Sequence, residues 1–97
     1  MIVVIFRSWL RPEAEAAYAE FAPKIEALAR VQPGILYFKS FTASDGERVT
    51  IAHFESDEAV VAWRNHPEHR EAQKRGSEEF YDSFSLDVAE VLHLSAT

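Results

Sequence analysis

The feature that most constrains the fold is a short polar turn, Ser44-Asp45-Gly46, between two extended apolar runs at 35–43 and 47–55. An Asp-Gly pair between such runs favours a hairpin, because both residues tolerate a positive φ. The sequence therefore predicts two neighbouring antiparallel strands in the middle of the chain.

A strand and an amphipathic helix are expected before this hairpin. Residues 2–10 are rich in Ile, Val, Phe and Trp, and the run ends before Pro12, which cannot donate to a sheet ladder. Bulky side chains occupy both alternating sets of this run, so we expect both faces of the strand to be covered. Apolar residues recur at helical spacing over 12–30, and Pro23 within this helix predicts a kink or a restart.

Two helical segments are expected after the hairpin. Ser56 is a good N-cap and is followed by two acidic residues, which favour the first turn of a helix. His66-Pro67 interrupts that helix, and proline suits the first position of the next one. We expect this third segment to extend over 68–80, with Glu71 and Arg75 paired one turn apart.

Alternate apolar residues over 80–94 predict a final, half-buried strand. The order βαββαβ is that of a ferredoxin-like α+β fold, a four-stranded antiparallel sheet with helices on one face. We expect a single domain over residues 1–97. The bare second face would carry large apolar side chains, so we expect a homodimer in which two sheets pack face to face.

Composition excludes several classes of function. A net charge of −6 argues against nucleic acid as a partner, because phosphate binding needs clustered Lys and Arg. The chain has no cysteine, so it has no disulfide, thiolate nucleophile or thiolate metal site. The apolar start is too short to span a bilayer and lacks the basic region of a signal peptide. We therefore expect a cytoplasmic protein that does not bind membranes.

The most specific motif is Ala-Trp-Arg-Asn-His-Pro-Glu-His-Arg-Glu-Ala-Gln at 62–73, followed by Gly76. With the hairpin turn and Phe-Glu-Ser-Asp-Glu-Ala at 54–59, it resembles the antibiotic biosynthesis monooxygenase (ABM) family over essentially the whole chain. The resemblance implies a dimeric α/β barrel whose subunits each enclose a small pocket between sheet and helices. It also implies several possible activities: cofactor-independent oxidation of quinol-like or anthrone-like aromatics, haem degradation, or a quinol-linked reaction.

The haem-degrading branch can be compared residue by residue. Resemblance to that branch would imply an asparagine on the first strand, a tryptophan on the second helix and a histidine farther along. Trp63 matches, but the first strand offers Phe6 and Arg7, and the later position falls on Gln73. Haem degradation is therefore disfavoured, and no cofactor is expected.

The best chemical candidates lie in the same motif, because histidine titrates near neutrality and can take a proton from a phenol or quinol. In the catalytic hypothesis His66 or His69 is the base, Trp63 stacks on the substrate ring, and Asn65 or Arg64 stabilises an oxyanion. The alternative, which we favour slightly, makes Trp63 a core anchor, His66 a helix cap and His69 a solvated residue. The two histidines lack a third ligand at helical spacing, so we expect no metal site.

Four further residues are candidates for substrate binding. His53 alternates with apolar residues on its strand and Tyr37 lies on the neighbouring strand, so they form either a pocket pair or a dimer-interface pair. Arg7 is placed to steady an anionic oxygen, although pairing with a nearby carboxylate is the favoured interpretation. Tyr81 either lines the pocket mouth or packs in the core.

Two functions of different classes follow from these observations. The first is a cofactor-independent oxygenase for a small aromatic quinol or anthrone, in which Tyr37 also stacks on the ring. The second is a ligand-binding or stress-related dimer that sequesters a hydrophobic molecule without turnover. Haem binding without degradation is a third, less favoured, hypothesis.

Overall fold

The computed structural model describes residues 1–96. Its elements follow the predicted βαββαβ order, with the second helical region divided at the His66-Pro67 break. The elements are β1 (Ile2–Leu10), a 3₁₀ turn (Pro12–Ala14), α1 (Glu15–Arg30), β2 (Ile35–Thr42), β3 (Arg48–Phe54), α2 (Asp57–Arg64), α3 (Pro67–Arg75), a π-helical turn (Gly76–Phe80) and β4 (Tyr81–Glu90).

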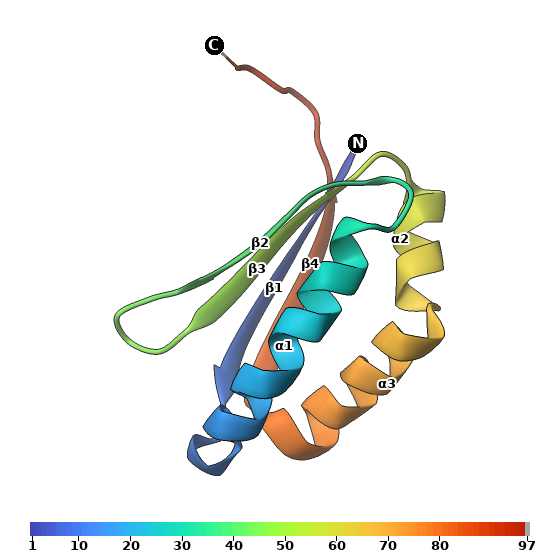
Figure 1. Ribbon diagram of the computed structural model, residues 1–97. Helices are drawn as coiled ribbons and strands as arrows, with labels where there is room; N and C mark the ends of the chain where they lie inside the picture. The colour runs from blue at the N-terminus through green and yellow to red at the C-terminus, as the bar shows by residue number, and fades with distance from the viewer. Residues whose placement is uncertain (97) are drawn as a thin grey trace.

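The four strands form one antiparallel sheet in the order β2-β3-β1-β4. Helices α1, α2 and α3 all cover the same face of this sheet (Figure 1). We call this the inner face. The opposite, outer face carries no helix in the described part of the chain. The ferredoxin-like α+β fold is therefore confirmed.

Local signals in the sequence account for two of the connections. In the β2–β3 turn, the Asp45 carboxylate accepts a hydrogen bond from the backbone N–H of Glu47 at 3.0 Å, and Gly46 adopts a φ of 94°. At the start of α2, the Ser56 hydroxyl accepts a hydrogen bond from the Ala59 N–H at 3.2 Å. The predicted hairpin turn and N-cap are both confirmed.

Of the kink or restart expected at Pro23, the restart does not occur, because α1 runs without interruption from Glu15 to Arg30. Pro23 and Ala19 both lie on the exposed side of the helix. The Ala19 carbonyl that loses its hydrogen-bond donor to proline can therefore be hydrated, which makes the proline tolerable there.

The last strand ends earlier than predicted, at Glu90. Glu90 pairs with Ile2, and the Val91 N–H donates to the Met1 carbonyl at 3.0 Å. The pairing of β4 with β1 ends there, and the rest of the apolar run continues without a strand partner in the described chain. In Figure 1 this segment extends away from the sheet.

The predicted ion pair between Glu71 and Arg75 is replaced by one between Arg75 and Glu79, with a nitrogen–oxygen distance of 2.9 Å. The Arg75 guanidinium lies over the rings of Phe21 and Phe80, at 4.6 and 4.8 Å from their centroids. Packing on these rings directs the side chain toward the π-helical turn and away from Glu71.

The core lies between the inner face and the helices. Its buried centre consists of Ala29, Ala52, Phe54, Val60 and Trp63. We expected both faces of the first strand to be covered, but within a single chain only its inner face is covered by helices (Figure 1). Its inner side chains contact the helical layer, whereas Trp9 on the outer face is 39% exposed.

Candidate active site

A cavity of about 530 Å³ lies between the inner face and the helices, within the size range of small-molecule sites. Its wall is mostly aromatic and aliphatic. On the side of β4, the lining residues are half exposed, so the cavity opens to solvent there. These residues are Phe84, Leu86 and Val88.

One end of the cavity is built at the break between α2 and α3, which turns the two helices so that Trp63, His69 and Gln73 meet. The rings of Trp63 and His69 stack with centroids 4.1 Å apart and planes inclined by 12°. Trp63 is 6% exposed and belongs to the core, as the structural interpretation expected. His69 is half-buried in the cavity wall, so the expectation that it is solvated is wrong.

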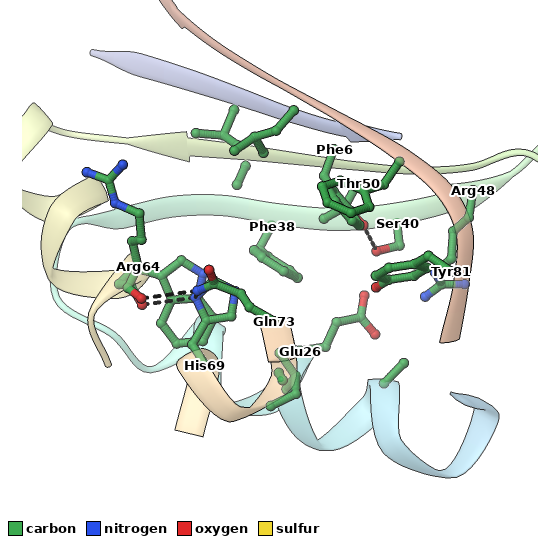
Figure 2. Close-up of a pocket in the computed structure, with 18 of the residues that line it drawn as sticks. Phe6, Glu26, Phe38, Ser40, Arg48, Thr50, Arg64, His69, Gln73 and Tyr81 are labelled. Carbon is green, nitrogen blue, oxygen red and sulfur yellow. Dashed lines mark hydrogen bonds between the residues drawn. The ribbon is translucent and has the colours of Figure 1, made fainter. Parts of the chain in front are cut away.

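The tautomer of His69 follows from its hydrogen bond. Its Nδ1 lies 2.9 Å from the Trp63 carbonyl oxygen, and a carbonyl can only accept, so Nδ1 carries the proton. Because Nδ1 is protonated, the Gln73 amide nitrogen 3.2 Å away does not donate to it and donates instead to the Arg64 carbonyl at 3.1 Å (Figure 2). The Trp63 ring and carbonyl therefore fix the imidazole and leave Nε2 as the unprotonated nitrogen, with no hydrogen-bond partner among residues 1–96.

The protonation state of His69 is set mainly by its burial. Burial lowers the pKa of His69 below its usual value of 6.5, and the nearby His66 lowers it further, while the hydrogen bond to the Trp63 carbonyl opposes both. The imidazole is therefore neutral at pH 7. A neutral imidazole with a free nitrogen in a cavity wall has the properties of a general base.

His66 and Asn65 lie outside the cavity wall. The His66 Nδ1 accepts a hydrogen bond from the Glu68 N–H at 3.2 Å and caps α3, which confirms its structural interpretation. Asn65 is exposed at the carboxyl end of α2. Arg64 does line the cavity, with an exposed side chain.

Tyr37, His53 and Arg7 all lie on the outer face and not in the cavity. The rings of Tyr37 and His53 are 5.2 Å apart, inclined by 39°, and no hydrogen bond joins them in the described structure. Arg7 forms an ion pair with Glu47 at 2.7 Å, which confirms the favoured interpretation of this arginine.

Tyr81, the fourth candidate, does line the cavity. Its ring packs edge-on against Phe6 with centroids 5.3 Å apart. Burial, with the neighbouring phenol of Tyr18, raises the pKa of Tyr81 far above its usual range. The phenol therefore stays protonated and keeps a hydrogen-bond donor at this end of the cavity.

Sequence reasoning missed the polar residues on β2 and β3 that face the cavity. The Ser40 and Thr50 hydroxyls are hydrogen-bonded to each other at 2.7 Å, and Arg48 lies next to them along β3. Arg48 alternates with Thr50 and Ala52, so strand periodicity could have placed it on the inner face once that face was known.

The described residues contain neither a metal-binding cluster nor a membrane-spanning helix. Within residues 1–96, no three His, Asp or Glu side chains are grouped closely enough to hold a metal ion. No described helix has the length and apolar character needed to cross a membrane.

Comparisons with known proteins agree with this fold. The family model described as antibiotic biosynthesis monooxygenase matches residues 1–75. An uncharacterized protein of Bacillus subtilis (strain 168), YqjZ, is 36% identical over 88 residues, which covers 91% of this chain and 76% of that protein. The structure of Rv0793 from Mycobacterium tuberculosis has a TM-score of 0.88 at 21% identity, covering 98% of each chain. A crystal structure of an antibiotic biosynthesis monooxygenase has a TM-score of 0.86 at 15% identity, covering 96% of this chain and 100% of that one.

Proposed function

This chain belongs to the antibiotic biosynthesis monooxygenase family, and on that premise we propose that it is a cofactor-independent monooxygenase for a small quinol-like or anthrone-like aromatic. The observation that carries the proposal is His69, a neutral imidazole in the wall of an aromatic cavity, whose Nε2 has no hydrogen-bond partner among residues 1–96. The cytoplasmic location expected from the sequence is part of the same proposal.

In the proposed reaction, His69 Nε2 removes an acidic proton from the substrate, a C–H in an anthrone or an O–H in a quinol. The resulting electron-rich anion reduces O₂ directly. For an anthrone, the new C–O bond gives a peroxide that loses water, so the CH₂ group and O₂ become a carbonyl and H₂O. The ring and carbonyl of Trp63 hold the imidazole in position, and the Tyr81 phenol is a donor for the developing oxyanion.

The test is oxygen consumption by the purified protein with a panel of quinols and anthrones. We expect uptake with at least one compound and a loss of about 100-fold or more in His69→Ala, because general bases typically contribute 10²–10⁴-fold. His66→Ala is the matched control, since this histidine caps α3, and it should keep activity within about twofold. No uptake with any compound, or full activity in His69→Ala, would contradict the proposal.

A second function is favoured by the largely apolar wall of the cavity. In that case the protein is a non-catalytic or stress-related dimer that sequesters a hydrophobic molecule. His69→Ala separates the two functions when binding and turnover are measured together. Retained affinity with lost turnover supports the enzyme, whereas retained affinity with no turnover in either protein supports the binder.

Haem binding is less well supported by the residues that line the cavity. Phe6 and Gln73 stand where the haem-degrading pattern has asparagine and histidine, so Trp63 alone of that pattern lines the cavity, although the His69 imidazole has the chemistry of an axial ligand. A titration followed by the Soret band tests this directly, and we expect no shift of that band.

We also propose that two copies pair through the outer face. Its central rows, on β1 and β3, carry partly exposed aliphatic residues that no described helix covers (Figure 1): Val3, Ile5, Val49 and Ile51.

A further inference from the structure

The end of the cavity away from His69 carries a cation for which the proposed oxidation has no use. Figure 2 shows Arg48 and Tyr81 at one end of the cavity and His69 with Gln73 at the other, with Phe38 between them. Arg48 is the first residue of β3 and shares the inner face with Thr50.

The Arg48 side chain is short of hydrogen-bond partners. Its Nε is buried and unpaired, and no carboxylate forms an ion pair with its guanidinium among residues 1–96. The guanidinium instead lies over the Tyr18 ring, 5.1 Å from the centroid. Ser8 lies directly opposite Arg48 on β1; it is 1% exposed, and its hydroxyl is also unpaired. Two adjacent buried polar groups without partners are rare in folded proteins and call for a ligand or water.

The hydroxyl groups near Arg48 are neutral and can donate a hydrogen bond as well as accept one. The Tyr81 phenol stays protonated, and the Ser40 and Thr50 hydroxyls bond to each other. The carboxylate that lines this cavity, Glu26, is 3.8 Å from Arg30 on the same helix, in an ion pair that does not include Arg48. A cation with neighbouring donors and no paired acceptor is suited to an oxyanion.

We propose that Arg48 binds a carboxylate of the ligand, so that the substrate class is a flat aromatic acid whose reactive position reaches His69. A guanidinium binds a carboxylate through two parallel hydrogen bonds, and the aromatic walls between the two ends accommodate the ring system. The role of this acid as a substrate rests on the proposed function. The binding site itself does not, because affinity can be measured without turnover.

The test uses isothermal titration calorimetry with 2-naphthoate and 2-naphthamide, which share a ring system and differ in charge. Neither compound is an oxidisable quinol, so binding is observed alone. We expect the wild-type protein to bind the naphthoate at least about tenfold more tightly, because hydrogen bonds between a guanidinium and a carboxylate are stronger than those to a neutral amide. Arg48→Gln should abolish this preference.

Arg70→Gln is the matched control, since Arg70 is exposed, lies outside the cavity wall and gives the same change in net charge. Equal wild-type affinity for the two compounds would overturn the proposal, and this comparison holds even if Arg48→Gln fails to fold. Loss of the preference in Arg64→Gln, with its retention in Arg48→Gln, would overturn it too.

The result of the naphthoate titration can be distinguished from the result of the oxygen-uptake test. A preference for naphthoate that depends on Arg48, without oxygen uptake on any aromatic, supports the carboxylate site and contradicts the monooxygenase. Oxygen uptake without a preference for naphthoate over naphthamide supports the monooxygenase and contradicts the carboxylate site.

Discussion

His69 owes its chemistry to two contacts that hold it and to the burial that keeps it neutral. The Trp63 ring stacks on the imidazole, and the Trp63 carbonyl accepts the Nδ1 proton. One residue thus determines both the orientation and the tautomer of the proposed base. The same burial has a consequence for stability that does not depend on any activity.

Because the pKa of His69 is lowered in the folded protein, the unfolded chain binds more protons between that pKa and 6.5. The free energy of unfolding therefore rises with pH across this window. The contribution is complete above 6.5 and is lost as the pH falls through the folded pKa. We expect urea unfolding between pH 7.5 and 5 to show this loss, and His69→Gln to flatten the curve.

His93→Gln is the control for this prediction, because His93 is exposed in the segment after β4. It should leave the pH dependence of unfolding unchanged. A curve that His69→Gln does not alter would contradict a lowered pKa at His69.

At the scale of elements, the α1–β2 connection packs tightly against the start of α2. Gly34 has a φ of 85°, and an added Cβ would come within 2.7 Å of the Ala59 Cβ at the start of α2. Gly34→Ala should therefore combine backbone strain with a steric clash, and we expect a loss of about 2–4 kcal/mol in the free energy of unfolding.

Gly46→Ala separates the two effects. Gly46 also has a positive φ of 94°, but the nearest atom to an added Cβ is a Trp9 ring carbon at 3.8 Å, an ordinary contact. Its cost should be about 1–2 kcal/mol, the strain alone. Equal losses in the two variants, measured by urea unfolding, would show that the clash with Ala59 is relieved by a small shift.

Local signals predicted most of the elements. The β1 strand has the predicted bounds, and the Asp45-Gly46 turn and the Ser56 cap form as expected because each depends on neighbouring residues alone. The end of β4 could not be predicted in this way. It depends on where the partner strand begins, at Ile2, far away in the sequence.

The site was predicted less completely, for a similar reason. The motif contained both His66 and His69, but the choice between them depends on how α2 and α3 turn at Pro67. Arg48 was missed because strand alternation does not say which face meets the helices. Where the sequence identified a residue but not its role, the role depends on neighbours that lie on other elements of the fold.

For the whole molecule, the two faces of the sheet differ in what covers them. On the outer face Arg7 is ion-paired with Glu47, and Lys39 and Asp87 lie on the edge strands β2 and β4, whereas the centre of the two middle strands is aliphatic. A monomer would leave this centre in contact with water, whereas two copies packed face to face would bury it. We therefore expect light scattering after size exclusion to give twice the mass of one chain.

Ile5→Lys tests this dimer without removing a contact that the monomer needs. Ile5 lies at the centre of the outer face, paired with Ile51 on β3 and with Asp87 on β4. In a monomer the new ammonium would be hydrated and adjacent to the Asp87 carboxylate, so the fold should tolerate it. In the dimer it would have to be buried between two sheets, which is costly enough to separate the copies.

We expect Ile5→Lys to elute as a folded monomer with an unchanged circular dichroism spectrum. Val31→Lys is the control, because Val31 is an exposed apolar residue at the end of α1, away from the outer face, and this variant should remain dimeric. A wild-type monomer, or a dimer that persists in Ile5→Lys, would show that the outer face is not the interface.

The cavity lies on the other side of the sheet, so a separated monomer should keep its affinity for cavity ligands. Affinity that falls with dimer dissociation would instead mean that the partner subunit helps to close the cavity along β4.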